Sequence, residues 1–458
     1  MSQRRRMLFS AFHMFSLTHH DQGMWAHPSS RQLEYNSLDY WVDTAKLLER
    51  GNFDFMFFAD VLAPYESYKG NREASVRAGM QFPINDPGEL LPVLAYATEN
   101  LGFVMTQNVL QEHPYAFARK MSTLDHLSKG RVGWNIVTSF LAGAGRNLGF
   151  GGLPEHQDRY GRAEDFLEVV YKLWEASWED DAVVKDFARK IYTDPAKVHE
   201  INHVGRYYDV VGPHLCEPSP QRTPFLFEAA SSQVGRDFAG RNAEALFVKS
   251  GSPEDAAVVV ADLRGAAERA GRSRDDVRLF AGQAFVVGST EAEARRLDKD
   301  LLESQSIDGN LAKQSVFLAY DFGAFDPEEP VKNIVARGEA RGMMRTLANL
   351  SPNPDYTVGE LVRWFGNQRT VGTPEQIADS IEAWQQAGVD GLNITYVISP
   401  GSFEDFVEHV VPILKKRGLM QERYEPGTLR EKIFGRGPNL PDNHPARKIR
   451  RAKFGDAS

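Results

Sequence analysis

Short apolar runs alternate along the chain with longer amphipathic stretches, and this alternation limits the possible folds more than any other feature. Amphipathic stretches such as residues 160–178 and 374–388 lie between runs that are rich in β-branched and aromatic residues. The runs predict eight strands, at 6–14, 52–60, 102–109, 131–138, 223–231, 245–250, 277–288 and 390–397. Eight strand-then-helix units predict an α/β fold of the (β/α)8 TIM-barrel type. An open doubly wound sheet is the alternative, because its pattern differs mainly in the number of strands.

Two stretches interrupt this repeat and are interpreted as insertions into one barrel domain that spans residues 1–458. The first insertion, approximately 179–223, is polar and contains VHEINHVGRYYDVVG. The second, approximately 304–370, has many Gly and Pro residues and is long enough to act as a lid. Residues from approximately 419 to 458 follow the last repeat and are expected to form a C-terminal extension.

Charge and cysteine content limit the possible partners. The net charge of −9, from 53 Lys and Arg against 62 Asp and Glu, argues against a general nucleic-acid binder. The basic run HPARKIRRAKF, 444–454, is expected to be a solvated tail or a subunit contact. A single cysteine, Cys216, excludes an internal disulfide and a Cys-rich metal site. The apolar run near the N-terminus is too short for a signal peptide or a membrane span, so a cytoplasmic protein without membrane association is expected.

The active site of a barrel lies at the carboxyl ends of its strands, so polar residues at these positions are the candidates for function. Asn135 is the most unusual, because a carboxamide inside an otherwise apolar strand needs a partner. The other candidates are Asp60, Thr106, Asn108, Thr138, Ser139, Ser231 and Ser232. Neutral hydroxyls and amides on several strand ends suit a large heterocycle with polar edges. The motifs of serine hydrolases, zinc proteases, P-loop proteins and dinucleotide-binding folds are not found in the sequence.

Each candidate also has a structural interpretation. Asp60 could cap the next helix or pair with a buried arginine, and Asn135 could tie two loops together. His19 and His20 could form an exposed loop, and no metal site is expected because no third ligand follows at a fitting spacing. Phe12 could be an ordinary core residue, as could Phe15, Met56 and Phe317.

Several longer runs resemble the bacterial-luciferase-like flavin-dependent monooxygenases. They include ERGNFDFMFFAD, EHPYAFARKMSTLDHLSKGRVGWNIVTS and EHQDRYGRAEDF, and the similarity extends from about residue 7 to 430. The most similar group contains nitrilotriacetate, dibenzothiophene-sulfone and long-chain-alkane monooxygenases. The resemblance implies a TIM barrel and an enzyme that inserts one oxygen atom from O2 into a substrate. It also implies reduced FMN (FMNH2), supplied by a separate NAD(P)H-dependent flavin reductase, and assembly as a homodimer or homotetramer.

The resemblance assigns roles to residues of this sequence. Asn135, Val137 and Thr138 would lie along the isoalloxazine, and Asp60 and Thr106 would approach its polar rim. The ribityl chain and phosphate would be held by Ser139, His156, Tyr160, Ser231 and Ser232. Phe317 stands where several relatives carry a histidine, so His20 is the remaining candidate for a catalytic proton donor. The substrate wall would consist of Phe12, His20, Met56, Phe247 and Phe317.

The aromatic composition of this wall predicts a planar aromatic or heteroaromatic substrate. A sulfone-type sulfur heterocycle and a nitrogen heterocycle both fit, and a riboflavin-cleaving enzyme that uses reduced FMN is an alternative. A non-catalytic flavin-binding or storage protein and a deazaflavin-dependent hydride-transfer enzyme are further alternatives. The long second insertion argues against storage, because a storage protein needs no lid. The run EHQDRYGRAEDF argues against the deazaflavin enzymes.

Overall fold

Eight parallel strands form a closed barrel in the computed structural model, which describes residues 5–229 and 232–455. The strands are β1 (Leu8–Met14), β2 (Phe55–Ala59), β3 (Gly102–Asn108), β4 (Val132–Val137), β9 (Phe225–Glu228), β10 (Ala245–Val248), β11 (Arg278–Val287) and β13 (Gly391–Thr395). Each strand pairs with the next in this order, and β13 pairs with β1 to close the barrel. Every predicted strand is present, and the closure confirms the barrel over the open sheet.

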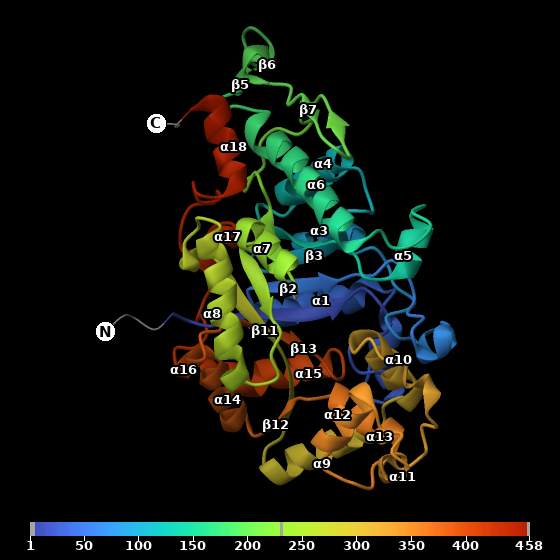
Figure 1. Cartoon of the computed structure of the whole chain (residues 1–458). Coiled ribbons are helices and arrows are strands. Elements are labelled where there is room, and N and C mark those ends of the chain that lie inside the picture. Colours follow the sequence, from blue (N-terminus) through green and yellow to red (C-terminus); the bar gives the residue numbers. More distant parts are fainter. Residues whose placement is uncertain (1–4, 230–231, 456–458) are drawn as a thin grey trace.

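Helices surround the barrel and bury its outer face (Figure 1). They are α1 (Leu38–Arg50), α3 (Pro87–Ala97), α4 (Pro114–Leu127), α6 (His156–Ala176), α7 (Gln233–Asn242), α8 (Pro253–Arg269), α14 (Pro374–Gln386), α15 (Gly401–Asp405) and α16 (Val411–Lys416). Side-chain caps fix several helix starts; for example, Asp86 accepts from the Gly88 N–H and Ser252 from the Asp255 N–H. Alternate strand residues such as Trp134 and Ile136 point outward into this helix-covered core.

The interior of the barrel is filled mainly by phenylalanines. Phe55, Phe57, Phe227 and Phe280 form one buried cluster, in which the Phe57 and Phe227 ring centroids are 4.9 Å apart. The interior is therefore a packed core, and a ligand can lie only above it, at the carboxyl ends of the strands.

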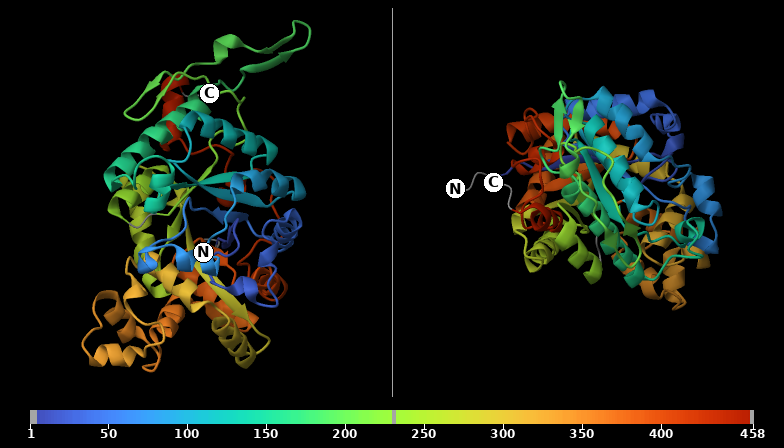
Figure 2. Two further views of the ribbon diagram at one scale, coloured as in Figure 1. Left: turned by 90° about the vertical axis from the view of Figure 1, so that its right-hand side faces the viewer. Right: turned by 90° about the horizontal axis from the view of Figure 1, so that it is seen from above.

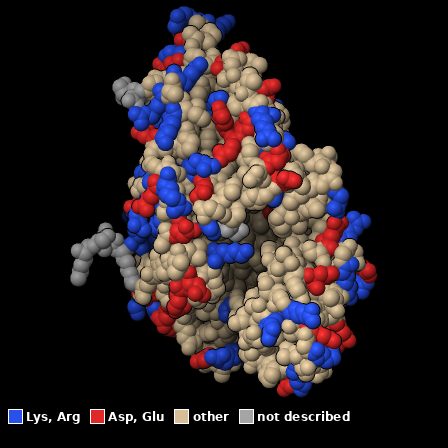
Figure 3. Space-filling model, viewed as in Figure 1, with Lys and Arg blue, Asp and Glu red and all other residues tan. Residues whose placement is uncertain are grey.

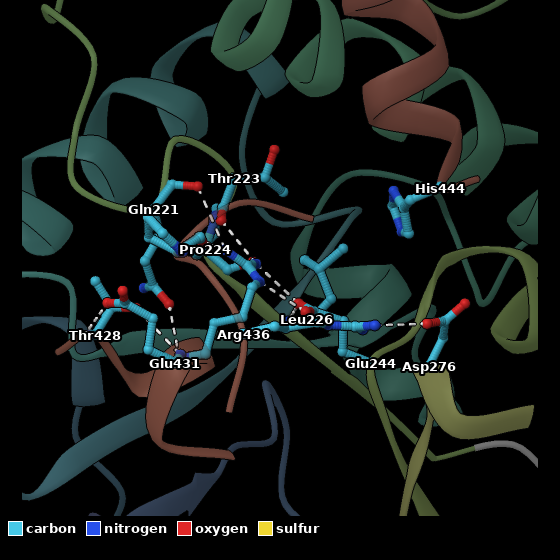
Figure 4. A network of polar contacts seen from close by, with 12 residues as sticks. Gln221, Thr223, Pro224, Leu226, Glu244, Asp276, Thr428, Glu431, Arg436 and His444 are labelled. Atoms are coloured by element: carbon cyan, nitrogen blue, oxygen red, sulfur yellow. Dashed lines mark hydrogen bonds and ion pairs between the residues drawn. The ribbon is translucent and has the colours of Figure 1, made fainter. Parts of the chain in front are cut away.

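The C-terminal residues close the opposite, amino-terminal end of the barrel. Leu429 and Ile433 of α17 (Leu429–Phe434) belong to the interior cluster. Between them, Arg430 is fully buried and forms an ion pair with the equally buried Glu244, with Nε 2.7 Å from Oε1. Figure 4 shows the surrounding polar network. The Arg430 Nη2 also donates to the carbonyls of Thr223 and Pro224, and its Nη1 donates to the carbonyls of Gln221 and Pro438. A buried charge requires such complete pairing.

The basic run at the C-terminus is not a free tail. It forms α18 (Pro445–Phe454), which lies along α6 (Figure 1). Arg450 is buried there and donates to the Glu175 carbonyl and to the Asp180 carboxylate, at 2.8 and 2.7 Å. The run therefore contributes to the packing of its own subunit.

Two long segments extend from opposite ends of the molecule (Figure 2). The segment between α6 and β9 holds two hairpins, β5 (Val183–Asp186) with β6 (Ile191–Thr193) and β7 (His203–Val204) with β8 (Asp209–Val210). The segment between α9 (Glu291–Glu303) and α14 holds α10 (Ile307–Phe317), α11 (Val331–Ala336), α12 (Gly342–Leu350), α13 (Val358–Gly366) and the short β12 (Thr370–Gly372). We call α10 to α13 the helical lobe.

The helical lobe has its own apolar core, which includes Phe322, Met344 and Leu361. Tyr65 and Met80, from the connection between β2 and α3 that contains α2 (Glu73–Ala78), complete this core. The lobe is thus fixed to the barrel beside the carboxyl ends of the strands, as is the short α5 (Ala142–Asn147) that follows β4 (Figure 1). Across the described ranges, no helix is long and apolar enough to cross a membrane.

Candidate active site

The surface is hollowed between the helical lobe and the main body of the protein (Figure 3). Two cavities lie at the carboxyl ends of the strands. The first, which we call the strand-end cavity, measures about 70 Å³ and is lined by Asp60, Val61, Leu62, Thr106, Asn108, Val137, Ser139, Phe140 and Leu141. The second, the lid cavity, measures about 190 Å³ and lies between β1, β11, β13 and the helical lobe. Because β1 and β2 are neighbours, the two cavities occupy adjacent parts of the barrel mouth.

Asn135 points into the barrel, because its neighbours Trp134 and Ile136 point outward. Its Nδ2 donates to the Thr106 Oγ1 on the adjacent strand at 2.9 Å. Its Oδ1 is buried and has no hydrogen-bond partner among the described residues. A buried acceptor left in this state costs about 1–3 kcal/mol, so the site requires a donor from a ligand or water.

Asp60 follows β2 and lines the strand-end cavity. Burial, together with a smaller contribution from the nearby Asp86 carboxylate, raises its pKa to about 8. Asp86, and not Asp60, caps the next long helix. Asp60 is therefore protonated at neutral pH, so its carboxyl can donate a hydrogen bond into the cavity.

Polar groups from three elements converge beside this cavity. Ser139 has a left-handed backbone, with φ 67°, which turns the chain sharply at the end of β4. The His156 and Tyr160 rings in the first turns of α6 lie 4.9 Å apart, and His156 Nε2 is 3.4 Å from the Ser232 Oγ. Ser232 also caps α7 through the Gly235 N–H. Ser231 lies outside the described residues. The start of α6 and the start of α7 thus present N–H groups and hydroxyls together, an arrangement that suits a phosphate.

Two charged residues of this region, Arg159 and Glu228, were not among the candidates predicted from the sequence. The Arg159 guanidinium donates to the Thr138 carbonyl at 3.4 Å and to the Ser139 carbonyl. Glu228 at the end of β9 is buried, and burial raises its pKa well above the usual value. Glu228 stands at a predicted strand end, so its position gave a signal. Nothing in the local sequence distinguishes Arg159 from an ordinary surface residue.

The substrate residues inferred from the sequence are only partly brought together. Phe12 and Phe247 lie inside the barrel with ring centroids 5.2 Å apart, and Phe12 also lines the lid cavity. Met56 was placed wrongly, because Phe55 and Phe57 take the inward positions of β2 and Met56 packs outward under the helices.

Phe317 lies near the surface, 48% exposed, at the end of α10. Its ring centroid is 6.3 Å from that of Tyr65, which is also 6.3 Å from that of Phe140. Phe140 lines the strand-end cavity. Phe317, Tyr65 and Phe140 therefore form a row of aromatic rings from the helical lobe to this cavity.

His20 lines the lid cavity, and its ring centroid lies 5.5 Å from that of Phe12. Its Nε2 is buried without a partner among the residues that the structure describes. Burial lowers the pKa of His20 well below its ordinary value, and the charge of Lys313 lowers it further. The imidazole is therefore neutral at neutral pH. In the described part of the chain, no group of three His, Cys, Asp or Glu residues is arranged to hold a metal ion.

The barrel thus carries neutral polar groups and aromatic rings at its mouth, beside the helical lobe. Residues 10–391 match the family described as luciferase-like monooxygenase, and the chain belongs to this family. It is a monooxygenase of the luciferase-like type, whose members depend on reduced flavin.

Three similar proteins cover nearly the whole chain. The long-chain alkane monooxygenase of Geobacillus thermodenitrificans is 43% identical over 97% of this chain and 98% of its own length. The crystal structure of DmoA from Hyphomicrobium sulfonivorans has a TM-score of 0.92 and 41% identity, covering 99% of this chain and 98% of that one. The crystal structure of a riboflavin lyase with modified FMN and riboflavin has a TM-score of 0.84 and 36% identity, covering 97% of this chain and 100% of that one.

Proposed function

We propose that this protein is the oxygenating component of a two-component system that acts on a planar aromatic or heteroaromatic compound. A separate NAD(P)H-dependent flavin reductase supplies FMNH2, and O2 is the co-substrate. The observation that carries the proposal is the barrel mouth, where a neutral hydrogen-bonding wall meets a row of aromatic rings. The wall suits the polar rim of a flavin, and the rings suit a flat, weakly polar substrate.

The residues at the mouth fit a flavin. The orphaned Asn135 Oδ1 can accept from a ring N–H, and the protonated Asp60 can donate to a ring carbonyl. We assign the remaining contacts with the isoalloxazine to Thr106, Val137 and Thr138, and those with the ribityl chain and phosphate to Ser139, His156, Tyr160, Ser231 and Ser232. Arg159 adds a positive charge beside the phosphate contacts. When bound, the reduced flavin would supply the reaction with oxygen. The protein would bind and orient the flavin and the substrate and would exclude water.

Charge pairing at the mouth supports an uncharged substrate. Arg369 lines the lid cavity but pairs with Asp21, at 3.1 Å, and with Asp298. A polycarboxylate needs several unpaired cations, and this arginine is already neutralised. The lid cavity, of about 190 Å³, suits a compact guest better than a long alkyl chain.

Cleavage of riboflavin is a second candidate. The riboflavin lyase is 36% identical to this chain, and its structure contains modified FMN and the substrate riboflavin, a planar heterocycle. The aromatic row from Phe140 to Phe317 suits such a ring equally well. The product of riboflavin cleavage differs from an oxygenated sulfur or nitrogen heterocycle, so one assay separates the two candidates.

The test is turnover with enzymatically supplied FMNH2 and oxygen, followed by mass spectrometry. The substrates are dibenzothiophene sulfone, quinoline, riboflavin, dimethyl sulfide, hexadecane and nitrilotriacetate. Oxygenated or cleaved ring products, labelled by ¹⁸O2, are expected. Turnover of dimethyl sulfide, hexadecane or nitrilotriacetate, with none of the ring compounds, would overturn the proposed substrate class. Stoichiometric FMN binding without turnover of any substrate would favour a flavin-storage protein.

We also propose a homodimer or homotetramer in the cytoplasm. The two hairpins between α6 and β9 expose large apolar side chains, among them Phe187, which is 91% exposed, and Val204, which is 84% exposed. Apolar groups at projecting positions suit a subunit contact. Sedimentation velocity measures the oligomer, and a monomer at micromolar concentration would contradict the proposal.

A further inference from the structure

Lys313 is the most unusual charged residue at the barrel mouth. It lies on α10, only 5% exposed, and lines the lid cavity with His20 and Phe12. Its ammonium donates to the His20 carbonyl at 2.7 Å. In the described ranges it has no other hydrogen bond and no carboxylate within ion-pair distance. Two of its three hydrogens are therefore free to meet an acceptor in the cavity.

Burial of a cation with a single neutral acceptor is costly. Burial lowers the pKa of Lys313 to about 8, and Asp21 opposes this shift. The ammonium form therefore still predominates at neutral pH, and an acceptor that enters the cavity would be strongly attracted. The neighbouring His20 is neutral and does not compensate the charge.

The charges around the cavity balance without a ligand. Asp21 and Asp298 hold Arg369 in place, and Asp21 also lies near enough to Lys313 to influence its pKa. Two carboxylates thus oppose two cations. A bound anion would leave the cluster with a surplus negative charge in a low-dielectric site, whereas a neutral acceptor keeps the balance.

The rest of the wall is compatible with such a guest. Phe12 forms an apolar floor, and Gln283, Gln368 and Thr395 contribute neutral polar groups. The cavity lies beside the strand-end cavity, to which we assign the flavin ring. A ring compound that lies between the two cavities can therefore direct a heteroatom toward Lys313.

We propose that the lid cavity is a specificity subsite for a neutral hydrogen-bond-accepting group of the substrate, such as a sulfone oxygen or a ring nitrogen, with Lys313 as the donor. This inference rests on the proposed function and refines its substrate class. Such a subsite would bind rings that carry a hydrogen-bond acceptor more tightly than hydrocarbon rings of the same shape. A hydrocarbon would leave the other two hydrogens of the Lys313 ammonium without an acceptor, and unpaired buried polar groups give strong discrimination between substrates.

The test compares three rings of similar shape: dibenzothiophene sulfone, dibenzothiophene and fluorene. Wild type, Lys313→Met and the control Lys332→Met are assayed with reductase-supplied FMNH2. Lys332 lies on the same lobe and forms an exposed pair with Asp355. A hydrogen bond from a charged donor contributes about 1.5–3 kcal/mol, so Lys313→Met should lower kcat/KM for the sulfone by about 10- to 150-fold. Lys313→Met should change kcat/KM for fluorene by no more than about twofold. Lys332→Met should leave kcat/KM for both the sulfone and fluorene unchanged.

Equal losses for all three rings in Lys313→Met, or no loss, would overturn the subsite. Binding of the three rings to wild type with oxidised FMN gives a measurement that needs no variant. There the sulfone should bind at least about tenfold more tightly than fluorene. Equal affinities would also overturn the subsite. If wild type binds the sulfone selectively but oxygenates none of the rings, the proposed function fails and the subsite stands.

Discussion

Asp60 provides the sharpest test of how the barrel mouth holds a flavin. Its raised pKa of about 8 keeps the proton on the carboxyl at neutral pH. The hydrogen bond that it donates is therefore present below about pH 8 and is lost as the pH rises above this value. Asp60→Asn replaces the carboxyl by a carboxamide that keeps a donor at every pH. Flavin affinity should fall in wild type as the pH rises through about 8. In Asp60→Asn it should show no such fall at this pH.

The size of the effect follows from the burial of the site. Loss of a buried donor leaves the opposing flavin acceptor unsatisfied, at a cost of about 1–3 kcal/mol. This corresponds to a dissociation constant about 5- to 150-fold higher on the alkaline side. Asp60→Ala, which removes the donor altogether, should show the weaker affinity at all pH values.

Anaerobic titration of reduced FMN between pH 6 and 10, followed by absorbance, measures these constants. Asp86→Asn provides a matched control, because asparagine can keep the cap of α3 while the charge that raises the Asp60 pKa is removed. This variant should move the transition to lower pH. Ionisation of the flavin itself affects binding to wild type and to every variant in the same way, so it does not account for a difference between them. A transition that is identical in wild type and Asp60→Asn would refute the reasoning.

Three further predictions concern other parts of the molecule. Tyr160→Phe combined with Ser139→Ala should weaken binding of reduced FMN by about 30- to 1,000-fold, from a loss of roughly 2–4 kcal/mol of phosphate contacts, measured by the same titration. Phe317→Ala should leave FMN affinity unchanged but open a path for water, so hydrogen peroxide should rise and product per reduced flavin should fall. Arg430→Met should lower the free energy of unfolding in urea by about 3–5 kcal/mol, because it leaves Glu244 charged and buried.

Each of these has a control or a contrary outcome. A dissociation constant within twofold of wild type in the double variant would show that the phosphate lies elsewhere. Leu350→Ala removes another exposed apolar side chain from the helical lobe and should not affect coupling. Unchanged coupling in Phe317→Ala would make that ring structural. Arg295→Met breaks an exposed pair with Glu291 and should cost less than about 0.5 kcal/mol.

The sequence by itself determined the barrel. Strand formation depends on local composition and period, so the apolar runs between helical stretches identified all eight strands. The order of strands then followed from the right-handed, sequential connections of such units. Position at a strand end also singled out Asp60, Thr106 and Asn135, and the structure gathers these at one edge of the barrel.

The tertiary structure decided which way each side chain points and what it meets. Met56 and Phe57 are both apolar neighbours on one strand, and only the closed barrel turns the phenylalanine inward. Arg430 finds Glu244 across 186 positions of sequence. Lys313, from the helical lobe, donates to the backbone of His20 across 293 positions of sequence. Protonation of Asp60 and the free hydrogens of Lys313 arise from burial beside distant groups, and burial is a property of the packed chain that no local pattern contains.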